Sequence, residues 1–360
     1  MKAVRIFEHG DVDVLKYDDY APPEVGPRDV LVRVVATSLS FWDIHYRKGG
    51  WLNGKNPLPP MLGRKMFPLP MQLGRDAAGV VEAVGEEVMS LAVGDRVAGL
   101  PHPENPHCPY AIRGLGNLST GVDLPGHTMF GGHAQYVSRP DHHWIKLPDA
   151  VDFAAAAAAL WSYATSHRIV KDRLRVALND VVLITGTSGG MGSATMALAK
   201  DMGAQVVGVT RSHTKREALT RMGADHVVVL PPDAAQAAKQ VREFTGDSGV
   251  DAAVDFTGNP ILQRLCIDSL RLGGTFVPGT SDWSQDPLPV SALDLIRLEI
   301  AVKGVRGSRL DDQRIVVELL AKGLIKPVIH ATMPLSEIAQ AHAALERGDI
   351  VGRMVLDPWA

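Results

Sequence analysis

The stretch VVLITGTSGGMG, residues 181–192, decides the fold because it joins a continuous apolar run to a glycine-rich turn. Such a run is typical of a strand that is buried on both faces of a sheet. Gly186, Gly189 and Gly192 then allow a tight turn, a close approach of the backbone to a pyrophosphate, and close packing of a helix. The N-terminus of that helix offers N–H groups and the positive end of its dipole to phosphate. The pattern predicts a dinucleotide site, and a plain strand-to-helix turn is the alternative.

Around this turn the chain alternates between short apolar runs and longer amphipathic segments. Repeated strand–helix units of this length predict a parallel, doubly wound sheet, the Rossmann arrangement. A glycine turn inside such a series is more specific than the same turn alone, which favours the dinucleotide interpretation. The strands are predicted at residues 181–185, 205–210, 226–230, 251–256 and 275–278, and the helices at residues 193–202, 215–222, 234–244 and 261–271.

The first 150 residues differ, because their apolar strands are separated by Gly and Pro turns. Strands are predicted at residues 29–36 and 77–85, and a turn with a further strand at residues 94–99. Two stretches without a clear period, residues 50–72 and 101–127, are predicted to be loops. The segment from about residue 307 onward again has a mixed pattern.

The composition excludes several classes of protein. The 360 residues, 46% hydrophobic and 21% charged, suffice for two globular domains. The net charge of −3 gives no reason to expect nucleic acid or an anionic membrane as a partner. The longest apolar run, residues 153–161, is far shorter than the ~20 residues of a spanning helix. Two cysteines and no apolar signal segment at the N-terminus lead us to expect a cytoplasmic location.

The end of the second predicted strand bears on the choice of dinucleotide. An NAD site needs an acidic residue there for the ribose 2′-hydroxyl, whereas this chain has Thr210, Arg211 and Ser212, followed by Lys215. Hydroxyl and basic groups suit a 2′-phosphate. The missing acid favours NADPH, although Arg211 and Lys215 are also explained as solvated surface charges.

Seven short motifs place the chain in a wider context: GRDAAGVV at residues 74–81, VGDRV at 93–97, GGHAQYV at 131–137, the glycine turn, GAD at 223–225, GG at 273–274 and IVGRMVL at 350–356. In this order they resemble the medium-chain dehydrogenase/reductase superfamily, the family of zinc alcohol dehydrogenases and quinone oxidoreductases. The resemblance implies an α/β protein with a GroES-like, β-rich catalytic domain at residues 1–164, completed by residues 307–360. It also implies a Rossmann NADP-binding domain at residues 165–306, with the active site in the cleft between the two.

The resemblance extends to individual cofactor contacts and to assembly. It places Thr165 near the nicotinamide carboxamide and Arg353 at the pyrophosphate. A homodimer joined through sheet edges is implied, with a tetramer as an alternative, and residues 274–278 are a candidate for part of such an edge. The remaining predicted cofactor contacts are Ser188, Gly190 and Met191 in the glycine turn, and Thr257 and Gly258 after the fourth strand.

The chain departs from the zinc alcohol dehydrogenases at both of their metal sites. In place of the two cysteines and the histidine that bind catalytic zinc, it has Ser40, Arg75 and either Leu160 or Trp161. None is a credible ligand, because zinc binds thiolate, imidazole or carboxylate. The structural zinc site retains one cysteine of four, at the positions Asn105, Cys108, Ala111 and Ser119. We therefore predict no metal.

The histidines do not change this prediction. No pair among them shows helical ligand spacing backed by a carboxylate, so we interpret each as a solvated loop residue. The candidates considered are His102, His107, His127, His142 and His143.

The chemistry that remains is hydride transfer without a Lewis acid. Reduction of a carbon–carbon double bond conjugated to a carbonyl needs less polarisation than direct carbonyl reduction, because hydrogen bonds can stabilise the enolate. Zinc-free members of the family, such as quinone oxidoreductases and enoyl reductases, use this chemistry, and it leads our interpretation. The alternatives are a zinc-independent alcohol dehydrogenase or ketone reductase, and a protein that binds NADPH without catalysis.

The segment 40–49 is expected to line the cleft. His45 or Tyr46 is the candidate proton donor, with Ser40 as a further candidate catalytic residue, and packing or ribose contact is the alternative for each. Asp43, Arg47, Arg75 and Asp76 are predicted to form an ion-pair network in place of zinc. Aromatic side chains are candidates for the pocket wall and would make it apolar or aromatic, with a place in the core as the alternative for each tryptophan: Phe41, Trp42, Trp51, Trp161 and Trp283.

Overall fold

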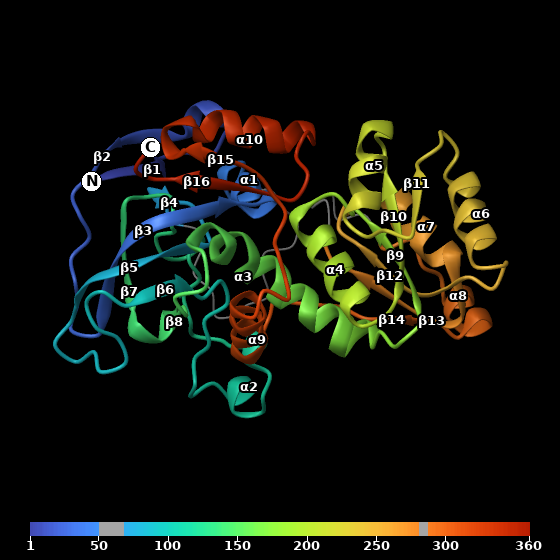
Figure 1. The fold of residues 1–360 in the computed structure, drawn as a ribbon, viewed down its shortest axis with the longest axis horizontal. Coiled ribbons are helices and arrows are strands. Elements are labelled where there is room, and N and C mark those ends of the chain that lie inside the picture. Colours follow the sequence, from blue (N-terminus) through green and yellow to red (C-terminus); the bar gives the residue numbers. More distant parts are fainter. Residues whose placement is uncertain (50–67, 281–286) are drawn as a thin grey trace. The chain divides into compact units, whose positions relative to one another are not determined.

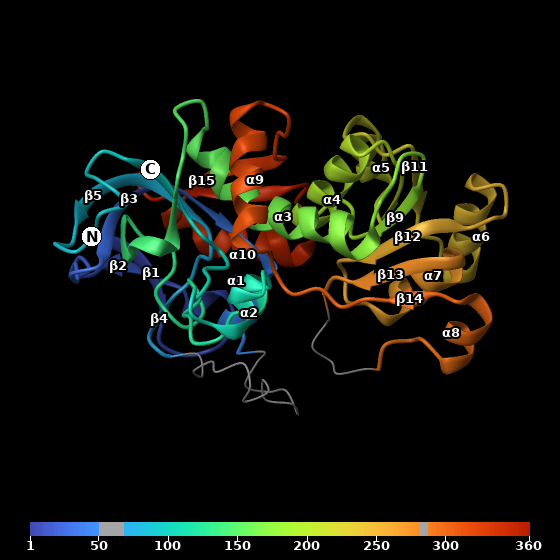
Figure 2. The same ribbon diagram turned by 90° about the horizontal axis from the view of Figure 1, so that it is seen from below.

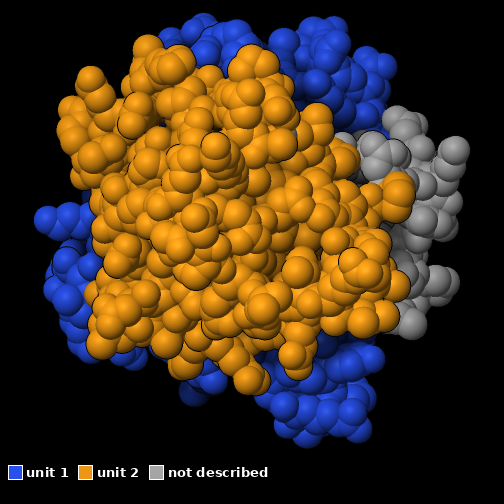
Figure 3. Space-filling view, turned by 90° about the vertical axis from the view of Figure 1, so that its right-hand side faces the viewer, with its two compact units in different colours: residues 1–164, 307–360 blue, residues 165–306 orange. Residues whose placement is uncertain are grey.

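The computed structural model describes residues 1–49, 68–280 and 287–360 (Figure 1). These residues divide into two compact units (Figure 3). Unit 1 comprises residues 1–164 and 307–360, so the C-terminal segment returns to the first part of the chain. Unit 2 comprises residues 165–306.

Unit 2 is built on a parallel sheet with the strand order β11-β10-β9-β12-β13-β14 (Figure 1). From β9 the chain builds outward to β11, then crosses back to β12 on the other side of β9. The carboxyl ends of β9 and β12 therefore flank the point where the strand order reverses, the usual ligand position in such sheets. The strands are β9 (Val181–Thr185), β10 (Gln205–Thr210), β11 (His226–Val229), β12 (Val250–Asp255), β13 (Leu270–Pro278) and β14 (Ala301–Val302).

Helices connect the strands of unit 2. α6 and α7 pack together on one face, where their apolar side chains share a core with Leu183, Val207 and Phe276 of the strands. α4 packs on β9 and β10. The doubly wound parallel sheet predicted from the sequence is confirmed. The helices are α4 (Gly190–Asp201), α5 (His213–Arg221), α6 (Ala234–Phe244), α7 (Pro260–Ser269) and α8 (Ala292–Leu298), with a π-helix at Ile169–Leu174.

Two predicted elements of unit 2 differ from the structure for a physical reason. α4 begins three residues before its predicted start, because Gly189 caps it in an extended conformation. β13 begins at Leu270 rather than residue 275 and is paired on both sides, by β12 and β14. The prediction that residues 274–278 form a sheet edge is therefore wrong, because β14 lies outside them.

Unit 1 is rich in β structure, as the sequence predicts, and has two sheets (Figure 2). The larger has the order β15-β16-β3-β5-β6-β8, with β7 also paired to β3, and the smaller has the order β2-β1-β4. The strands are β1 (Lys2–Ile6), β2 (Lys16–Asp19), β3 (Asp29–Leu39), β4 (Met71–Gln72), β5 (Ala77–Val84), β6 (Arg96–Gly99), β7 (Tyr136–Pro140), β8 (Trp144–Lys146), β15 (Ile329–Pro334) and β16 (Arg353–Asp357).

Alternate residues of β3 form the centre of unit 1. Val30, Val32 and Val34 point to one side and are buried with Val97 and Val137 of the neighbouring strands. β16 pairs antiparallel with the end of β3, which incorporates the C-terminal segment into the sheet. The predicted strands at residues 29–36 and 77–85, and in the segment 94–99, correspond to β3, β5 and β6.

The helices of unit 1 are short apart from α3 and α9. The segment 101–127, predicted as a loop, contains α2 and one turn of 3-10 helix. None of the helices that the structure describes has both the length and the apolar character needed to cross a bilayer. The α-helices are α1 (Phe41–Arg47), α2 (Pro109–Ile112), α3 (Phe153–Arg168, which continues into unit 2), α9 (Leu310–Ala321) and α10 (Ile338–Arg347); the 3-10 turns are Val12–Val14, Gly116–Leu118, Asp141–His143 and Leu335–Glu337.

Candidate active site

The glycine turn of unit 2 has the backbone shape that phosphate binding needs. Gly186 has φ +70°, in the left-handed region that favours glycine. A Cβ atom on Gly192 would lie 2.3 Å from the carbonyl oxygen of Gly186, so a side chain there would push the helix off the turn. Gly189 caps α4, which leaves the N–H groups of Gly190 and Met191 in the first helical turn available to an anion.

Thr187 holds this turn against the next strand. Its hydroxyl donates to the carbonyl oxygen of Ile184 at 2.5 Å and accepts from the N–H of Val209 at 3.0 Å. The following residue, Ser188, is partly exposed within the turn. The glycine turn is therefore fixed to both β9 and β10 before any ligand binds.

The turn after β10 carries hydroxyl and basic groups. The hydroxyl of Thr210 accepts from the N–H of Ser212 at 3.1 Å, and the hydroxyls of Ser212 and Thr214 lie 2.7 Å apart. Arg211 is exposed, and Lys215 is half-buried in the first turn of α5. Residues 205–216 contain no Asp or Glu, so the acid that would bind a ribose 2′-hydroxyl is absent from this strand end.

Asp255, at the end of β12, is a positioning residue that the sequence analysis missed. Its carboxylate is fully buried and accepts hydrogen bonds from Thr185, from the N–H and hydroxyl of Thr257, and from the N–H of Gly258, at 2.5 to 3.0 Å. It therefore fixes the two predicted cofactor residues beside the glycine turn. An aspartate inside an otherwise apolar strand, VDAAVDF, was the signal that could have identified it.

Two hydroxyl groups lie at the end of α3 within unit 2. The hydroxyl of Ser166 lies 2.8 Å from that of Thr195 and donates to the carbonyl oxygen of Met191 at 3.3 Å, which joins α3 to α4. The hydroxyl of Thr165 is buried and makes no hydrogen bond within the described part of the chain. A buried hydroxyl without a partner is compatible with the predicted contact to the nicotinamide carboxamide, which stays a prediction.

In unit 1, Ser40 and Asp43 fix the start of α1. The N–H and the hydroxyl of Ser40 both donate to Oδ2 of Asp43, at 2.9 and 2.7 Å. Oδ1 of Asp43 accepts from the N–H of Gly74 at 3.0 Å, which links α1 to the turn before β5. Ser40, a predicted catalytic residue, thus has a structural role as the helix cap, and its catalytic role stays a prediction.

Arg75 follows this turn, and its guanidinium is buried with 4% of the residue exposed. Its Cζ lies 4.6 Å from the ring centroid of Trp161, the geometry of a cation–π contact. Nη2 donates to the hydroxyl of Tyr46 at 3.2 Å, and Nη1 donates to the carbonyl oxygen of Pro101 at 3.3 Å. Nε is buried and has no partner among the described residues.

The two rings that this guanidinium contacts belong to a group of four, Trp42, Tyr46, His127 and Trp161, which we refer to as the aromatic cluster. Tyr46 and His127 are stacked with centroids 4.6 Å apart and planes 3° apart. Trp42 is stacked on Trp161 at 6.3 Å and also contacts Tyr46 at 5.7 Å. Trp42 and Trp161 were predicted to line a pocket, and the structure places both in one cluster with the candidate acid Tyr46.

Comparison with known proteins identifies the family. A model of the alcohol dehydrogenase GroES-like domain matches residues 26–149, and a model described as a zinc-binding dehydrogenase matches residues 190–322. The chain belongs to the medium-chain dehydrogenase/reductase superfamily. The resemblance inferred from the sequence motifs is thereby confirmed, and a nicotinamide cofactor is expected in unit 2.

Relatives within the superfamily differ in their named activities. An alcohol dehydrogenase of Geobacillus stearothermophilus is 29% identical over 344 residues, covering 95% of this chain and 96% of that protein. The human quinone oxidoreductase is 27% identical over 364 residues, covering 99% and 97%. A solved structure of an NAD-dependent alcohol dehydrogenase matches with a TM-score of 0.86 and 29% identity over 99% of both chains. The relatives therefore include proteins named as alcohol dehydrogenases and as quinone oxidoreductases, and at least one of them is named as NAD-dependent.

The residues at the superfamily's catalytic zinc position do not fit zinc. Ser40 caps a helix, Arg75 places a cation where the metal would need a donor, and Trp161 packs on that cation. No group of three or more His, Cys, Asp or Glu side chains within residues 1–49, 68–280 and 287–360 is arranged to hold a metal ion. A zinc ion at this position would face a guanidinium in place of an imidazole or thiolate ligand.

Hydrogen bonds hold the lobe that carries structural zinc elsewhere in the superfamily. The hydroxyl of Ser119 accepts from the N–H of Asn105 at 2.8 Å, and the sulfur of Cys108 accepts from the N–H of Thr120 at 3.3 Å. N–H and O–H donors around the sulfur lower the pKa of Cys108 to about 6, with the hydroxyl of Thr120 as the largest contributor. The carboxylate of Glu104 anchors the lobe to the N-terminus of α9.

His45 lies apart from the guanidinium, at a hollow on the surface of unit 1. This hollow of about 590 Å³ is lined by α1 and α10, including Phe41, which is 53% exposed. Burial is the main cause of a lowered pKa of His45, and the positive charge of Lys48 lowers it further. His45 is therefore neutral at pH 7, and as a proton donor it would have to act from the neutral imidazole.

The predicted ion-pair network of Asp43, Arg47, Arg75 and Asp76 is wrong. None of the four forms a salt bridge with another in the described structure. Arg47 instead pairs with Glu346 at 2.8 Å, because the C-terminal segment folds back onto α1. The four residues are close together in the sequence, but the ion-pair partners of Arg47 and Asp76 come from the C-terminal segment.

Arg353, predicted to bind the pyrophosphate, has a partner inside unit 1. Its Nη2 lies 2.5 Å from Oδ2 of Asp76 and donates to the hydroxyl of Ser38. Burial raises the pKa of Asp76 to about 6, an effect that the charge of Arg353 opposes. Arg353 lies in β16, and its guanidinium forms an ion pair with Asp76 inside unit 1. The contact with the pyrophosphate stays a prediction.

Two of the loop histidines are not solvated, which corrects that interpretation. His127 and His143 are buried, with 2% and 3% exposed, because the loop folds back on the sheet. His127 stacks on Tyr46, and burial lowers the pKa of His143 to about 3. The predicted pocket residues Trp51 and Trp283 lie outside the described residues.

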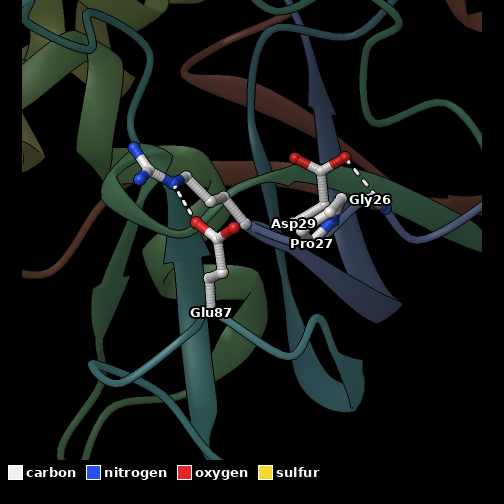
Figure 4. A pocket seen from close by; sticks show the side chains of 5 residues that line it. Gly26, Pro27, Asp29 and Glu87 are labelled. Carbon is white, nitrogen blue, oxygen red and sulfur yellow. Dashed lines mark hydrogen bonds and ion pairs between the residues drawn. The ribbon is translucent and has the colours of Figure 1, made fainter.

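A second hollow in unit 1, of about 310 Å³, carries no candidate function (Figure 4). The turn before β3 forms part of its wall, and there the N–H of Gly26 donates to the carboxylate of Asp29 at 3.2 Å. An ion pair between Arg28 and Glu87, 2.6 Å apart, forms the rest. These are exposed turn contacts, and the lining includes no nucleophile or histidine.

Proposed function

We propose that this protein is a zinc-independent, NADPH-dependent oxidoreductase that reduces an activated carbon–carbon double bond in an enone, quinone or enoyl substrate. The observation that carries the proposal is the guanidinium of Arg75, packed on Trp161 at the zinc position of the superfamily. Direct carbonyl reduction in zinc enzymes relies on a Lewis acid at that position. A conjugated substrate needs only hydrogen-bond donors for its oxygen.

The proposed cofactor site uses unit 2. The glycine turn and the N-terminus of α4 would hold the pyrophosphate, and Thr257 and Gly258, fixed by Asp255, would lie beside it. Arg211, Ser212 and Lys215 support a 2′-phosphate, hence NADPH rather than NADH. When bound, the cofactor supplies a hydride.

The proposed catalytic residues are in unit 1. Tyr46 holds a proton on its hydroxyl, and the hydrogen bond from Arg75 stabilises the phenolate that remains once this proton is given away. Trp42 and Trp161 offer flat apolar surface for a conjugated substrate. His45 is the second candidate donor.

Oxidation of NADPH, followed by its absorbance, tests the proposal. We expect turnover with an enone and little with the matching saturated ketone, no loss on treatment with a chelator, and less than one zinc per chain by elemental analysis. Faster turnover of the saturated ketone would support a zinc-independent ketone reductase instead. Tight NADPH binding without turnover on a broad panel of enones, quinones and ketones would support a non-catalytic role.

A further inference from the structure

The buried charges of unit 1 do not balance. Among the described residues, the guanidinium groups of Arg47, Arg75, Arg139 and Arg353 are buried, and two of them have carboxylates within salt-bridge distance. Arg47 is matched by Glu346 and Arg353 by Asp76. Arg75 and Arg139 have no carboxylate within 4.0 Å in the described part of the chain, although an isolated buried charge is costly.

Arg75 keeps donor capacity as well as charge. A guanidinium has five N–H groups, and Arg75 makes two hydrogen bonds within the residues that the structure describes, both to neutral oxygens. Nε is buried without a partner among the described residues. A carboxylate or an enolate oxygen would satisfy both the charge and the remaining donors.

Asp43 does not compensate this charge. Both of its carboxylate oxygens already accept hydrogen bonds, from Ser40 and from Gly74. Asp76 influences Arg75 only through space, and its own direct partner is Arg353. Asp43 thus holds the backbone before Arg75, Asp76 pairs with Arg353, and neither acid pairs with Arg75 among the described residues.

The aromatic cluster extends from this cation towards the surface of the unit. Arg75 and Trp161 are buried, whereas Trp42, which contacts both Trp161 and Tyr46, is half-buried. Flat rings that begin at a partly exposed tryptophan and end at a buried cation suit a planar, conjugated ligand with an oxygen at one end.

We propose that Arg75 is a catalytic residue that binds the carbonyl oxygen of the substrate and stabilises its negative charge in the transition state. This deepens the function proposed above and rests on it. When bound, NADPH would supply a hydride that forms a C–H bond at the β-carbon, while the C=C π bond breaks and its electrons move onto the oxygen held by Arg75. NADPH would be oxidised to NADP⁺ and the substrate reduced, once the α-carbon takes the proton of the Tyr46 hydroxyl and the carbonyl re-forms. A fixed cation at the oxygen would thus do without metal what zinc does in relatives.

Binding of benzoate, a planar carboxylate, tests the site without turnover. Because Arg75 packs on Trp161, we expect benzoate to change the tryptophan fluorescence of the wild type saturably. Arg75→Met, which removes the charge and keeps most of the volume, should lose this response. Arg139→Met is the matched control: it also deletes a buried, carboxylate-free guanidinium, but one that packs on Trp144 outside the aromatic cluster, and it should bind benzoate like the wild type. Equal benzoate affinity in Arg75→Met and the wild type would overturn the proposal.

The rate of turnover gives a second test of the proposal. Arg75→Met should lower kcat on an enone by about 100-fold or more, the usual cost of losing a donor to a developing oxyanion, with the KM for NADPH unchanged. If circular dichroism shows that Arg75→Met is unfolded, Arg75→Lys takes its place. Lysine keeps the positive charge but lacks the planar set of N–H donors of a guanidinium, so kcat should fall by about tenfold. A kcat that stays within twofold in these variants also overturns the inference. A wild type that binds benzoate through Arg75 but reduces no enone refutes the proposed reaction and leaves the anion site standing.

Discussion

The glycine turn of unit 2 and the Arg75 site of unit 1 are built in opposite ways. The turn is made of backbone: Gly186 supplies a positive φ, Gly192 supplies the space beside it, and the first N–H groups of α4 are available to a phosphate. The Arg75 site is made of side chains from α1, α3 and the segments 74–75 and 101–127. Backbone sites tolerate exchange of most neighbouring side chains, whereas one substitution at a side-chain site changes its chemistry.

This difference explains how a chain can keep the superfamily's fold while residues that do not fit zinc occupy the metal position. A guanidinium in place of a neutral, metal-binding imidazole adds a positive charge to the site. A side chain at Gly192 in the glycine turn, by contrast, would need a Cβ where none fits. The following predictions test this contrast.

The largest effect is expected in the turn itself. Gly192→Val places a Cβ 2.3 Å from the carbonyl oxygen of Gly186, so the helix must shift away from the pyrophosphate. We expect NADPH affinity, measured by the fluorescence of the bound cofactor, to fall by about 100-fold or more, with the benzoate response of unit 1 retained. Gly189→Ala is the control, because its Cβ meets nothing closer than 3.5 Å and its φ is −78°. A similar loss in both variants would contradict the steric explanation.

Acid should destabilise unit 1 before unit 2. Burial lowers the pKa of His133, His143 and His342, all in unit 1, and that of His143 to about 3. The unfolded state binds protons below about pH 6.5 that the folded state does not, so the stability from the neutral His143 is present above that pH and is lost as the pH falls. At pH 5 the loss is about 2 kcal/mol for this residue.

Hydrogen exchange at pH 7 and pH 5 measures this difference. Protection should fall more in the strands of unit 1 than in β9, β10 and β12. His143→Gln should flatten the pH dependence, and His107→Gln, at an exposed histidine of unit 1 that does not contribute to the pKa of His143, should not. Equal loss of protection in both units would refute the assignment.

The choice of cofactor gives a smaller effect. Arg211→Ala should weaken NADPH binding by about tenfold and leave NADH binding unchanged, because one charge-assisted contact to the 2′-phosphate is lost. Arg221→Ala, at the far end of α5, removes an equally exposed charge and should change neither. Parallel titrations of both nucleotides decide the point, and unchanged NADPH affinity in Arg211→Ala would reject the assigned contact.

The smallest effect is expected in the lobe of residues 101–127. Glu104→Gln keeps an acceptor near the N–H of Leu310 but removes the negative charge at the N-terminus of α9, which costs about 0.5–1 kcal/mol. We expect a chelator to leave the midpoint of thermal unfolding unchanged, because hydrogen bonds from Asn105, Thr120 and Leu310 hold this lobe together. A chelator-dependent fall in the midpoint would show that a metal stabilises it after all.

Several features of the site follow from residue types alone. Glycine spacing after a buried strand specifies a phosphate turn, because only glycine adopts the backbone conformation and leaves the space. The absence of an acid after β10, of metal ligands at Ser40 and Arg75, and of all but one cysteine in the lobe of residues 101–127 is equally visible in the sequence, since it depends on what a residue is and not on where it points.

The partners of buried charges could not be predicted in the same way. Asp43, Arg47, Arg75 and Asp76 are close in sequence and were expected to pair with one another, yet two of them pair with Glu346 and Arg353 from the C-terminal segment. Asp255 was overlooked because its function lies in the hydrogen bonds that it accepts from two turns.

The sequence by itself determined the doubly wound sheet, the glycine turn and the superfamily, because local backbone requirements and hydrophobic periodicity depend on the types and spacing of neighbouring residues. Only the tertiary structure decided that Arg75 lies on Trp161 beside Tyr46 without a carboxylate. The partner of a buried charge is set by contacts between segments that are far apart in the chain, and such contacts cannot be predicted from a local sequence pattern.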